Sequence, residues 1–301
     1  MLRGSRISLH VMVVLSSILY VYFSTVFVFI QQGYGMSTSD GLFNVVVFTL
    51  VAIMCVHSYI RAVFTDPGRV PSSYSPDVEE ADHAIQEVKR KGGDLRYCQK
   101  CSHYKPPRAH HCRICNRCVL RMDHHCIWLN NCVGHANYKF FLIFVMYAVI
   151  ACIYSLVLLI GNLTVESPED NGDEGSFRTV YVISGIFLVP LSMSLGIFMM
   201  WHFYLLLQNK TTIEYHEGVR AMLLAEKGGP VYSHPYNLGV YGNLVSCIVC
   251  RFLFGYLMRH IHLMVLGPNI IFWMCPSSRH IASGIRFRTA LHKLAVSSSS
   301  K

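Results

Sequence analysis

Charged side chains are scarce in this chain. Of its 301 residues only 14% are charged, whereas 52% are hydrophobic, and the mean hydropathy is positive. A soluble globular domain of this length normally carries about a quarter charged residues to cover its surface. The composition therefore excludes an ordinary soluble fold and indicates an integral membrane protein.

Four long stretches contain most of the hydrophobic residues. A helix of about 20 apolar residues crosses the hydrocarbon core of a bilayer, and residues 9–30, 42–60, 140–160 and 180–207 are long enough. The first stretch lacks a small-residue cleavage site and a second follows at once, so we expect an anchor and not a cleaved signal peptide. Four spans place both termini on the same side of the membrane.

Basic residues are nearly absent from two of the connecting segments. Residues 31–41 contain no Lys or Arg, and residues 161–178 contain five acidic residues and only Arg178. Cytoplasmic segments are enriched in Lys and Arg, so both termini and the long segment 62–139 are expected to face the cytosol. The net charge of +9 then reflects membrane topology, and no nucleic-acid partner is predicted.

Cysteines are concentrated in one polar segment, which contains seven of the 12 in the chain. Pairs separated by two residues suit tetrahedral zinc, because sulfurs on a tight turn can reach one ion at about 2.3 Å each. Disulfides are the competing interpretation, but they need an oxidising compartment. A cytosolic segment is reducing, so zinc is predicted.

The spacing alone leaves two distributions of ligands open. The thiols and nearby histidines can form two sites of three thiols and one imidazole, which leaves one thiol free. They can also form one all-thiol site and one three-thiol site, which leaves none. Cys126 favours the first distribution, because it directly follows Asp123, His124 and His125, and an imidazole beside a thiol activates a cysteine nucleophile.

The complete pattern is C-x2-C-x9-HC-x2-C-x2-C-x4-DHHC-x5-C-x4-N-x3-F, which starts at Cys98 and ends at Asn137 and Phe141. It resembles the cysteine-rich domain of the DHHC protein S-acyltransferases, or palmitoyltransferases. The resemblance implies two structural zinc ions, the first bound by Cys98, Cys101, His111 and Cys118 and the second by Cys112, Cys115, His125 and Cys132.

The same resemblance implies the catalytic residues. Cys126 is the expected acyl-accepting nucleophile, His124 the general base, and Asp123 the residue that orients His124. Adjacent His124 and His125 can serve different sites if the backbone is extended there, because consecutive side chains of a strand point in opposite directions.

The reaction that the resemblance implies takes a long-chain acyl group, typically palmitoyl, from acyl-CoA. The group is then passed from Cys126 to cytosolic cysteines of membrane-associated proteins. An acyl chain gains about 0.8 kcal/mol per buried CH2, so it is expected to stay within the bilayer. Lys105 and Arg108 are assigned to the CoA phosphates, and Trp128 is also assigned to the acyl-CoA site.

Three shorter motifs extend the resemblance to about residues 9–246. Asp66-Pro67-Gly68 follows the second span, Thr211-Thr212-Ile213-Glu214 follows the fourth, and residues 239–243 are similar to a C-terminal motif. The chain departs from the family at Ile127, where Pro is common, and in an atypical insert at residues 247–264.

Together these observations predict an all-α integral membrane protein. We expect four transmembrane helices and a cytosolic two-zinc cysteine-rich domain between helices 2 and 3. The expected organisation is an N-terminal tail with helices 1–2 (1–61), a cytosolic loop with the zinc domain at about 96–139 (62–139), helices 3–4 with an acidic lumenal loop (140–207), and a cytosolic C-terminal region (208–301). Golgi membranes are the family's usual location. The alternative function is a membrane-anchored zinc-binding scaffold without acyltransferase activity.

Overall fold

The structure, a computed structural model, describes residues 7–76, 95–164, 174–225, 234–248 and 285. The chain divides into two compact units, which are residues 1–63 with 140–201 and residues 64–139 with 202–301. Most of the predicted insert at 247–264, and the middle of the acidic loop, lie outside the described residues.

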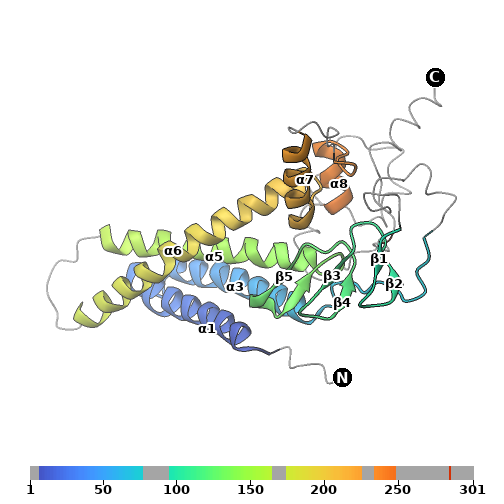
Figure 1. Cartoon of the computed structure of the whole chain (residues 1–301). Coiled ribbons are helices and arrows are strands. Elements are labelled where there is room, and N and C mark those ends of the chain that lie inside the picture. The colour runs from blue at the N-terminus through green and yellow to red at the C-terminus, as the bar shows by residue number, and fades with distance from the viewer. Residues whose placement is uncertain (1–6, 77–94, 165–173, 226–233, 249–284, 286–301) are drawn as a thin grey trace, which may run out of the picture. The chain divides into compact units, whose positions relative to one another are not determined.

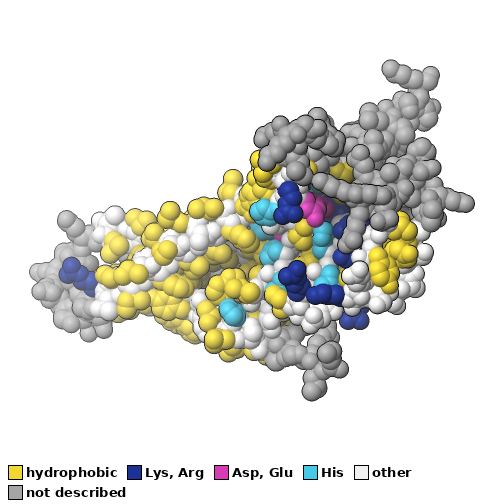
Figure 2. Space-filling model, viewed as in Figure 1, with side chains coloured by type: hydrophobic (Ala, Val, Ile, Leu, Met, Phe, Trp, Pro, Cys, Tyr) yellow, Lys and Arg dark blue, Asp and Glu magenta, His cyan; other side chains and the backbone are white. Residues whose placement is uncertain are grey.

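The first unit consists of long apolar helices. Four helical segments are long and apolar enough to cross a membrane: Leu9–Gly33, Ser39–Phe64, Tyr138–Thr164 and Phe177–Leu207. The prediction of four such helices is confirmed, and each is a few residues longer than its apolar stretch. Many large hydrophobic side chains of these helices are exposed, and hydrophobic side chains are abundant on the face of this unit seen in Figure 2; such a surface suits contact with lipid.

The first of these segments is not a uniform α-helix. It comprises α1 (Leu9–Ser24), a π-helical turn (Thr25–Ile30) and α2 (Gln31–Gly33). Thr25 in the π-helical turn has a hydroxyl within 2.7 Å of Ser155 Oγ, and the Asn162 amide donates to the Phe29 carbonyl at 2.9 Å. Polar contacts of this kind join helices in an apolar environment, where the hydrophobic effect does not.

The other three long helices are α3 (Ser39–Phe64), α5 (Tyr138–Thr164) and α6 (Glu174–Leu207) (Figure 1). Aromatic rings pack between them and α1. Phe48 of α3 lies 6.1 Å from Tyr22 and 5.4 Å from Tyr154, measured between ring centroids. The core of this unit is formed by side chains of the first helical segment, α3 and α5, together with Leu188 of α6.

The second unit contains three short antiparallel hairpins that follow one another along the chain. Their strands are β1 (Tyr97–Cys98) with β2 (His103–Tyr104), β3 (His110–Cys112) with β4 (Arg117–Val119), and β5 (His124–Cys126) with β6 (Asn131–Val133). The prediction of an all-α fold omitted these strands and is corrected to a mostly helical fold. A tight turn that carries a pair of cysteines needs extended backbone on both sides, and the two strands of a hairpin provide it.

Two helices complete the described part of this unit. They are α7 (Thr212–Ala225) and α8 (Val240–Ile248). Thr211 and Glu214 cap the start of α7 reciprocally: the Glu214 N–H donates to Thr211 Oγ1 at 3.2 Å, and the Thr211 N–H donates to Glu214 Oε2 at 2.8 Å. This capping box satisfies two backbone donors that a helix start leaves unpaired.

Candidate active site and metal-binding clusters

The first cluster joins the turn of one hairpin to the strands of the next. Cys98 and Cys101 lie on the β1–β2 turn, and His111 and Cys118 are cross-strand partners in the β3–β4 hairpin. The three sulfurs of Cys98, Cys101 and Cys118 lie 3.6, 3.2 and 3.9 Å from His111 Nδ1. The structure therefore brings together all four residues assigned to the first zinc ion.

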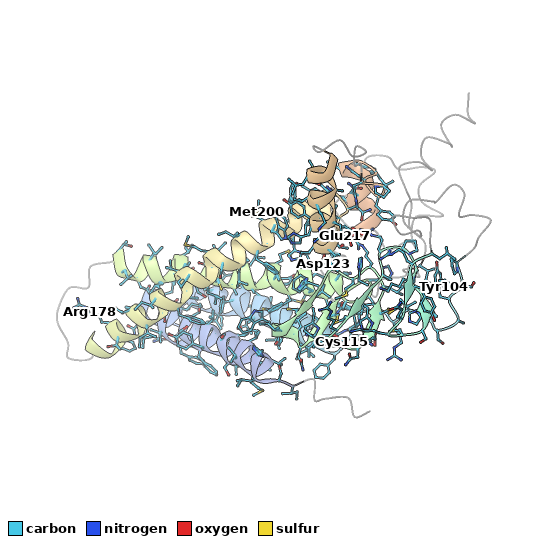
Figure 3. The ribbon with its side chains drawn as sticks, in the orientation of Figure 1. Tyr104, Cys115, Asp123, Arg178, Met200 and Glu217 are labelled. Carbon is cyan, nitrogen blue, oxygen red and sulfur yellow. The ribbon has the colours of Figure 1, made fainter. Side chains whose placement is uncertain are left out.

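The second cluster repeats this construction one hairpin further along the chain. Cys112 and Cys115 lie on the β3–β4 turn (Figure 3 labels Cys115), and His125 and Cys132 are cross-strand partners in the β5–β6 hairpin. The sulfurs of Cys112, Cys115 and Cys132 lie 3.6, 3.5 and 3.5 Å from His125 Nδ1. These are the four residues assigned to the second ion.

Both donor sets fit a tetrahedral zinc ion. With Zn–S of about 2.3 Å and Zn–N of about 2.0 Å, tetrahedral geometry separates sulfur from nitrogen by about 3.5 Å. The six sulfur-to-nitrogen distances range from 3.2 to 3.9 Å. In each cluster the donor atoms all lie within 4.8 Å of one another. The ligand atom of each histidine is Nδ1.

Cys126 occupies the same place in the third hairpin as Cys98 and Cys112 do in the first two. Each is the last residue of the first strand of its hairpin, and they are spaced 14 residues apart. The residue four positions later has a left-handed backbone in every hairpin, with φ of 52° at Ser102, 49° at Asn116 and 46° at Asn130. The three turns therefore share one backbone geometry.

The third turn differs in its side chains. Where the first two turns have Cys101 and Cys115, the third has Leu129, which is buried. The chain then continues into α5 at Tyr138 and not into a further hairpin. Cys126 thus lacks both the second thiol and the cross-strand His–Cys pair of a metal cluster, and it belongs to neither four-residue group.

Strand β5 presents its two histidines to different surroundings. His125 points to the second cluster, whereas His124 Nδ1 lies 2.7 Å from Asp123 Oδ2. The expectation of an extended backbone at this dipeptide is confirmed. Because Asp123 engages Nδ1, the second ring nitrogen of His124 remains for the Cys126 thiol, with which the imidazole also hydrogen-bonds.

Asp123 is held by the start of α7 (Figure 3). The Thr212 N–H donates to Asp123 Oδ1 at 3.0 Å, and the Thr212 hydroxyl donates to Oδ2 at 2.8 Å. A helix start carries a partial positive charge that favours an anion. Although burial opposes ionisation of Asp123, its hydrogen bond with His124, its interaction with the imidazole charge and the Thr212 N–H lower the pKa of this carboxyl.

The carboxylate in turn changes the basicity of His124. Burial would lower the pKa of the His124 imidazole, but its hydrogen bonds to Asp123 and Cys126 outweigh burial and raise the pKa to about 9. A raised pKa favours the protonated imidazole beside a thiolate. The arrangement can therefore accept and hold the proton of a cysteine nucleophile.

A third imidazole lies against this pair. His202, in the last turns of α6, is 1% exposed, and its ring centroid lies 5.9 Å from that of His124. Its Nδ1 lies 3.5 Å from the hydroxyl of Tyr138. Sequence analysis did not assign His202 to the site, because a single histidine within an apolar span has no spacing that links it to the cysteines.

Arg108 has a structural partner inside the second unit. Its guanidinium pairs with both carboxylate oxygens of Glu214, at 2.6 and 2.8 Å, and also donates to Asn209. The side chain is buried and its guanidinium carbon lies 4.3 Å from the centroid of the Tyr236 ring. Although burial opposes ionisation, Arg108 lowers the pKa of Glu214 to about 2. The assignment of Arg108 to the CoA phosphates is not supported by this arrangement.

The other two residues assigned to acyl-CoA are more accessible. Lys105 is half-buried beside the first hairpin, where its N–H donates to the Arg96 carbonyl. Trp128 is 48% exposed and Ile127 is 51% exposed. Both belong to the 3₁₀ turn Ile127–Leu129, directly after Cys126. Two apolar side chains therefore lie exposed next to the thiol.

Asp66-Pro67-Gly68 supports the hairpins from the end of α3. The Gly68 N–H donates to Asp66 Oδ1 at 3.0 Å, and Arg117 pairs with Asp66 Oδ2 at 2.6 Å. Gly68 has φ of 105°, a conformation that glycine adopts without strain. The Asp66 carboxylate therefore joins the segment after α3 to Arg117 of the second hairpin.

Comparisons with known proteins identify relatives that are named as acyltransferases. A family model described as DHHC palmitoyltransferase matches residues 91–219. Probable protein S-acyltransferase 16 of Arabidopsis thaliana is 58% identical over 300 residues, which cover 99% of each chain. Probable protein S-acyltransferase 15 of the same plant is 44% identical over 89% of this chain and 97% of its own. Palmitoyltransferase ZDHHC20-B of Danio rerio is 30% identical over 83% of this chain and 76% of its own.

The chain belongs to the DHHC palmitoyltransferase family. It is therefore an acyltransferase that acts on proteins, and the enzyme class predicted from the sequence is confirmed.

Proposed function

We propose that the chain is a protein S-acyltransferase in which Cys126 carries the acyl group between donor and protein substrate. The observation that supports this most directly is the chain of contacts from Thr212 through Asp123 and His124 to Cys126. A cysteine, an adjacent base and a residue that orients the base are the elements of nucleophilic catalysis.

In the first step the Cys126 thiol transfers its proton to His124, and the thiolate attacks the carbonyl carbon of an acyl-CoA thioester. The carbon–sulfur bond to CoA breaks, and the CoA thiolate takes the proton from the His124 imidazolium. In the second step the same imidazole accepts the proton of a substrate cysteine, whose sulfur attacks the carbonyl carbon of the acyl group on Cys126. The bond between that carbon and Cys126 Sγ breaks, and the Cys126 thiolate takes the proton back from the His124 imidazolium. Asp123 keeps the ring oriented and stabilises its protonated form throughout.

The two four-residue clusters are proposed to bind structural zinc. Their three thiols and one imidazole match a closed structural site, and the sulfur-to-nitrogen distances fit the ion. When bound, zinc supplies folding free energy to a segment whose strands are two or three residues long. The second ion would fix His125 and so hold β5, on which His124 and Cys126 lie.

The membrane supplies the context for the acyl group. Four apolar helices are proposed to span it, with both termini and the hairpins on the cytosolic side because Lys and Arg are concentrated there. Lys105 is proposed to attract the CoA phosphates, and Trp128 to contact the acyl chain near the thioester. The long-chain donor is typically palmitoyl-CoA, the acceptors are cysteines of membrane-associated proteins, and Golgi membranes are the proposed location.

The alternative of a zinc-binding scaffold is not favoured. A scaffold needs no base beside Cys126, yet the buried Asp123 carboxylate is hydrogen-bonded to both His124 and Thr212. Burial of a carboxylate is costly unless it is fully hydrogen-bonded. One relative named as a probable protein S-acyltransferase also matches 99% of the chain.

The test is Cys126→Ser in the purified full-length protein, incubated with a labelled palmitoyl-CoA. We expect the wild type to form a hydroxylamine-sensitive acyl-enzyme and the variant to form none, with zinc content near two per chain in both. Cys55→Ser, which removes a thiol within α3, is the matched control and should label normally. A labelled Cys126→Ser variant, or loss of zinc from it, would contradict the proposal.

A further inference from the structure

Three metal-ligating side chains outside the two clusters converge on one point. Asp123, His124 and His202 each place a ligand atom within 4.8 Å of the other two. They come from the segment before β5, from β5 itself and from the end of α6. Asp123 and His202 are each 1% exposed, and the His124 side chain is 25% exposed, so two of the three ligands are buried and the third is accessible to solvent.

The arrangement is close to that of a bound ion. Two imidazoles on one zinc ion, with Zn–N of about 2.0 Å, have ring centroids separated by about 5 Å, and those of His124 and His202 are separated by 5.9 Å. Asp123 Oδ2 lies 2.7 Å from His124 Nδ1, a distance that must open to about 3.3 Å when an ion replaces the shared proton.

We propose that Asp123, His124 and His202 form a third, reversible cation site that inhibits the enzyme when a zinc-class ion binds there. Two imidazoles and one carboxylate form the ligand set of zinc sites that keep a fourth position open for water. The nitrogen donors select zinc or cobalt over magnesium and calcium, which prefer oxygen ligands. The site differs from the two clusters because it contains no thiolate.

An ion at this site removes the base from the reaction. A cation on His124 Nδ1 breaks the hydrogen bond to Asp123 and draws electron density from the ring. The second ring nitrogen then becomes a poorer acceptor for the Cys126 proton. This inhibitory effect rests on the proposed function, whereas occupancy of the site does not.

Cobalt distinguishes the third site from the two clusters. The purified full-length protein, loaded with two zinc ions, is titrated with Co²⁺ while visible and near-ultraviolet absorption and bound metal are measured. We expect one further ion per chain, visible bands of a four- or five-coordinate cobalt centre, and no sulfur-to-cobalt charge transfer. Acyl-enzyme formation should fall in parallel with occupancy and return after brief treatment with a weak chelator.

The variant that tests the ligand set is His202→Gln. Loss of one of three ligands should raise the cobalt concentration for half-occupancy by more than about 10-fold, while the two zinc ions stay bound. His124→Gln should also fail to bind the third ion. Because bound metal is measured directly, this result tests occupancy of the site without an activity assay. His216→Gln, which changes an exposed histidine of α7, is the matched control and should bind cobalt as the wild type does.

Three results would overturn the proposed cation site. A third ion with sulfur charge transfer would be bound by Cys126 instead, and unchanged affinity in His202→Gln would remove His202 from the ligand set. Absence of a third ion at millimolar cobalt would also refute the site. If Cys126 never forms an acyl-enzyme but the third ion binds as described, the proposed function fails and the metal site stands.

Discussion

The first two hairpins and the third hairpin share a backbone but differ in what their turns carry. Cys98 and Cys112 each begin a Cys-x2-Cys turn, and the next hairpin supplies a His–Cys pair across its strands. Cys126 begins an equivalent turn with Leu129 at the second thiol position, and a helix follows where another hairpin would be needed. One construction thus gives two four-residue clusters that could hold a metal ion and one thiol that belongs to neither.

This difference explains how Cys126 can lie among six other thiols of the segment and still belong to neither four-residue cluster. A thiolate is a ligand for zinc as well as a nucleophile. A cysteine that is to react must therefore lack the neighbouring ligands that would complete a zinc site. The third turn does so by replacing one thiol with a leucine side chain, and β5 then places His124 next to Cys126. In the proposed mechanism the two clusters would hold the strand that carries the nucleophile and would not include the nucleophile itself.

The largest expected effect comes from damage to the first two hairpins. We expect Cys112→Ser to lose about one zinc ion per chain and to unfold at a much lower temperature, because structural zinc contributes about 10–16 kcal/mol of apparent binding free energy. Zinc content and thermal unfolding in detergent measure this. Cys126→Ser removes a thiol from the equivalent position of the third hairpin and should change neither. Normal stability in Cys112→Ser would refute the ligand assignment.

The third turn can be made to resemble the first two. Leu129→Cys places a second thiol three positions after Cys126, and we expect acyl-enzyme formation to become strongly sensitive to added zinc and to recover with a chelator. Leu129→Ser is the control, because removal of the buried leucine costs about 2–5 kcal/mol in either variant while serine does not bind zinc. If both variants respond equally to zinc, the missing second thiol is not the reason why the third hairpin differs from the first two in zinc binding.

A smaller effect is expected where the third hairpin meets α7. Thr212→Val removes the hydroxyl that donates to Asp123 and keeps the N–H contact. Hydrogen bonds to charged groups contribute about 1.5–3 kcal/mol, so the rate of acyl-enzyme formation should fall by about 10- to 100-fold, with zinc content unchanged. Thr212→Ser keeps the hydroxyl and should react at nearly the wild-type rate. A valine variant as fast as the serine variant would mean that Asp123 does not depend on this contact.

Much of the fold and part of the site could be predicted from sequence. The four helices follow from hydrophobic length alone, and the grouping of His111 with Cys98, Cys101 and Cys118 followed from the family pattern. Thr211 and Glu214 were noted as a motif, and their capping box is a local pattern that the spacing contains. The 14-residue repeat of the hairpins was also present in the sequence, and it marks Cys126 as the first thiol of an incomplete cluster.

Other features depend on tertiary contacts that no local pattern contains. Arg108 was assigned to CoA because phosphates favour cationic donors, but its buried guanidinium pairs with Glu214, which lies 106 residues further along the chain. His202 lies within a hydrophobic span, and only the folded chain places it beside His124. The strands were missed because two- and three-residue segments show no period that hydrophobic patterns can reveal.

The smallest expected effect concerns the backbone that all three hairpins share. Ser102, Asn116 and Asn130 have left-handed backbones, which asparagine tolerates better than serine does. We expect Ser102→Asn to stabilise the first hairpin by about 0.5 kcal/mol and Asn116→Ser to destabilise the second by a similar amount. The temperature of zinc release measures both changes. A shift of that temperature in the same direction by both substitutions would contradict this expectation. It would mean that the turns do not share one backbone preference, even though their side chains can still be compared.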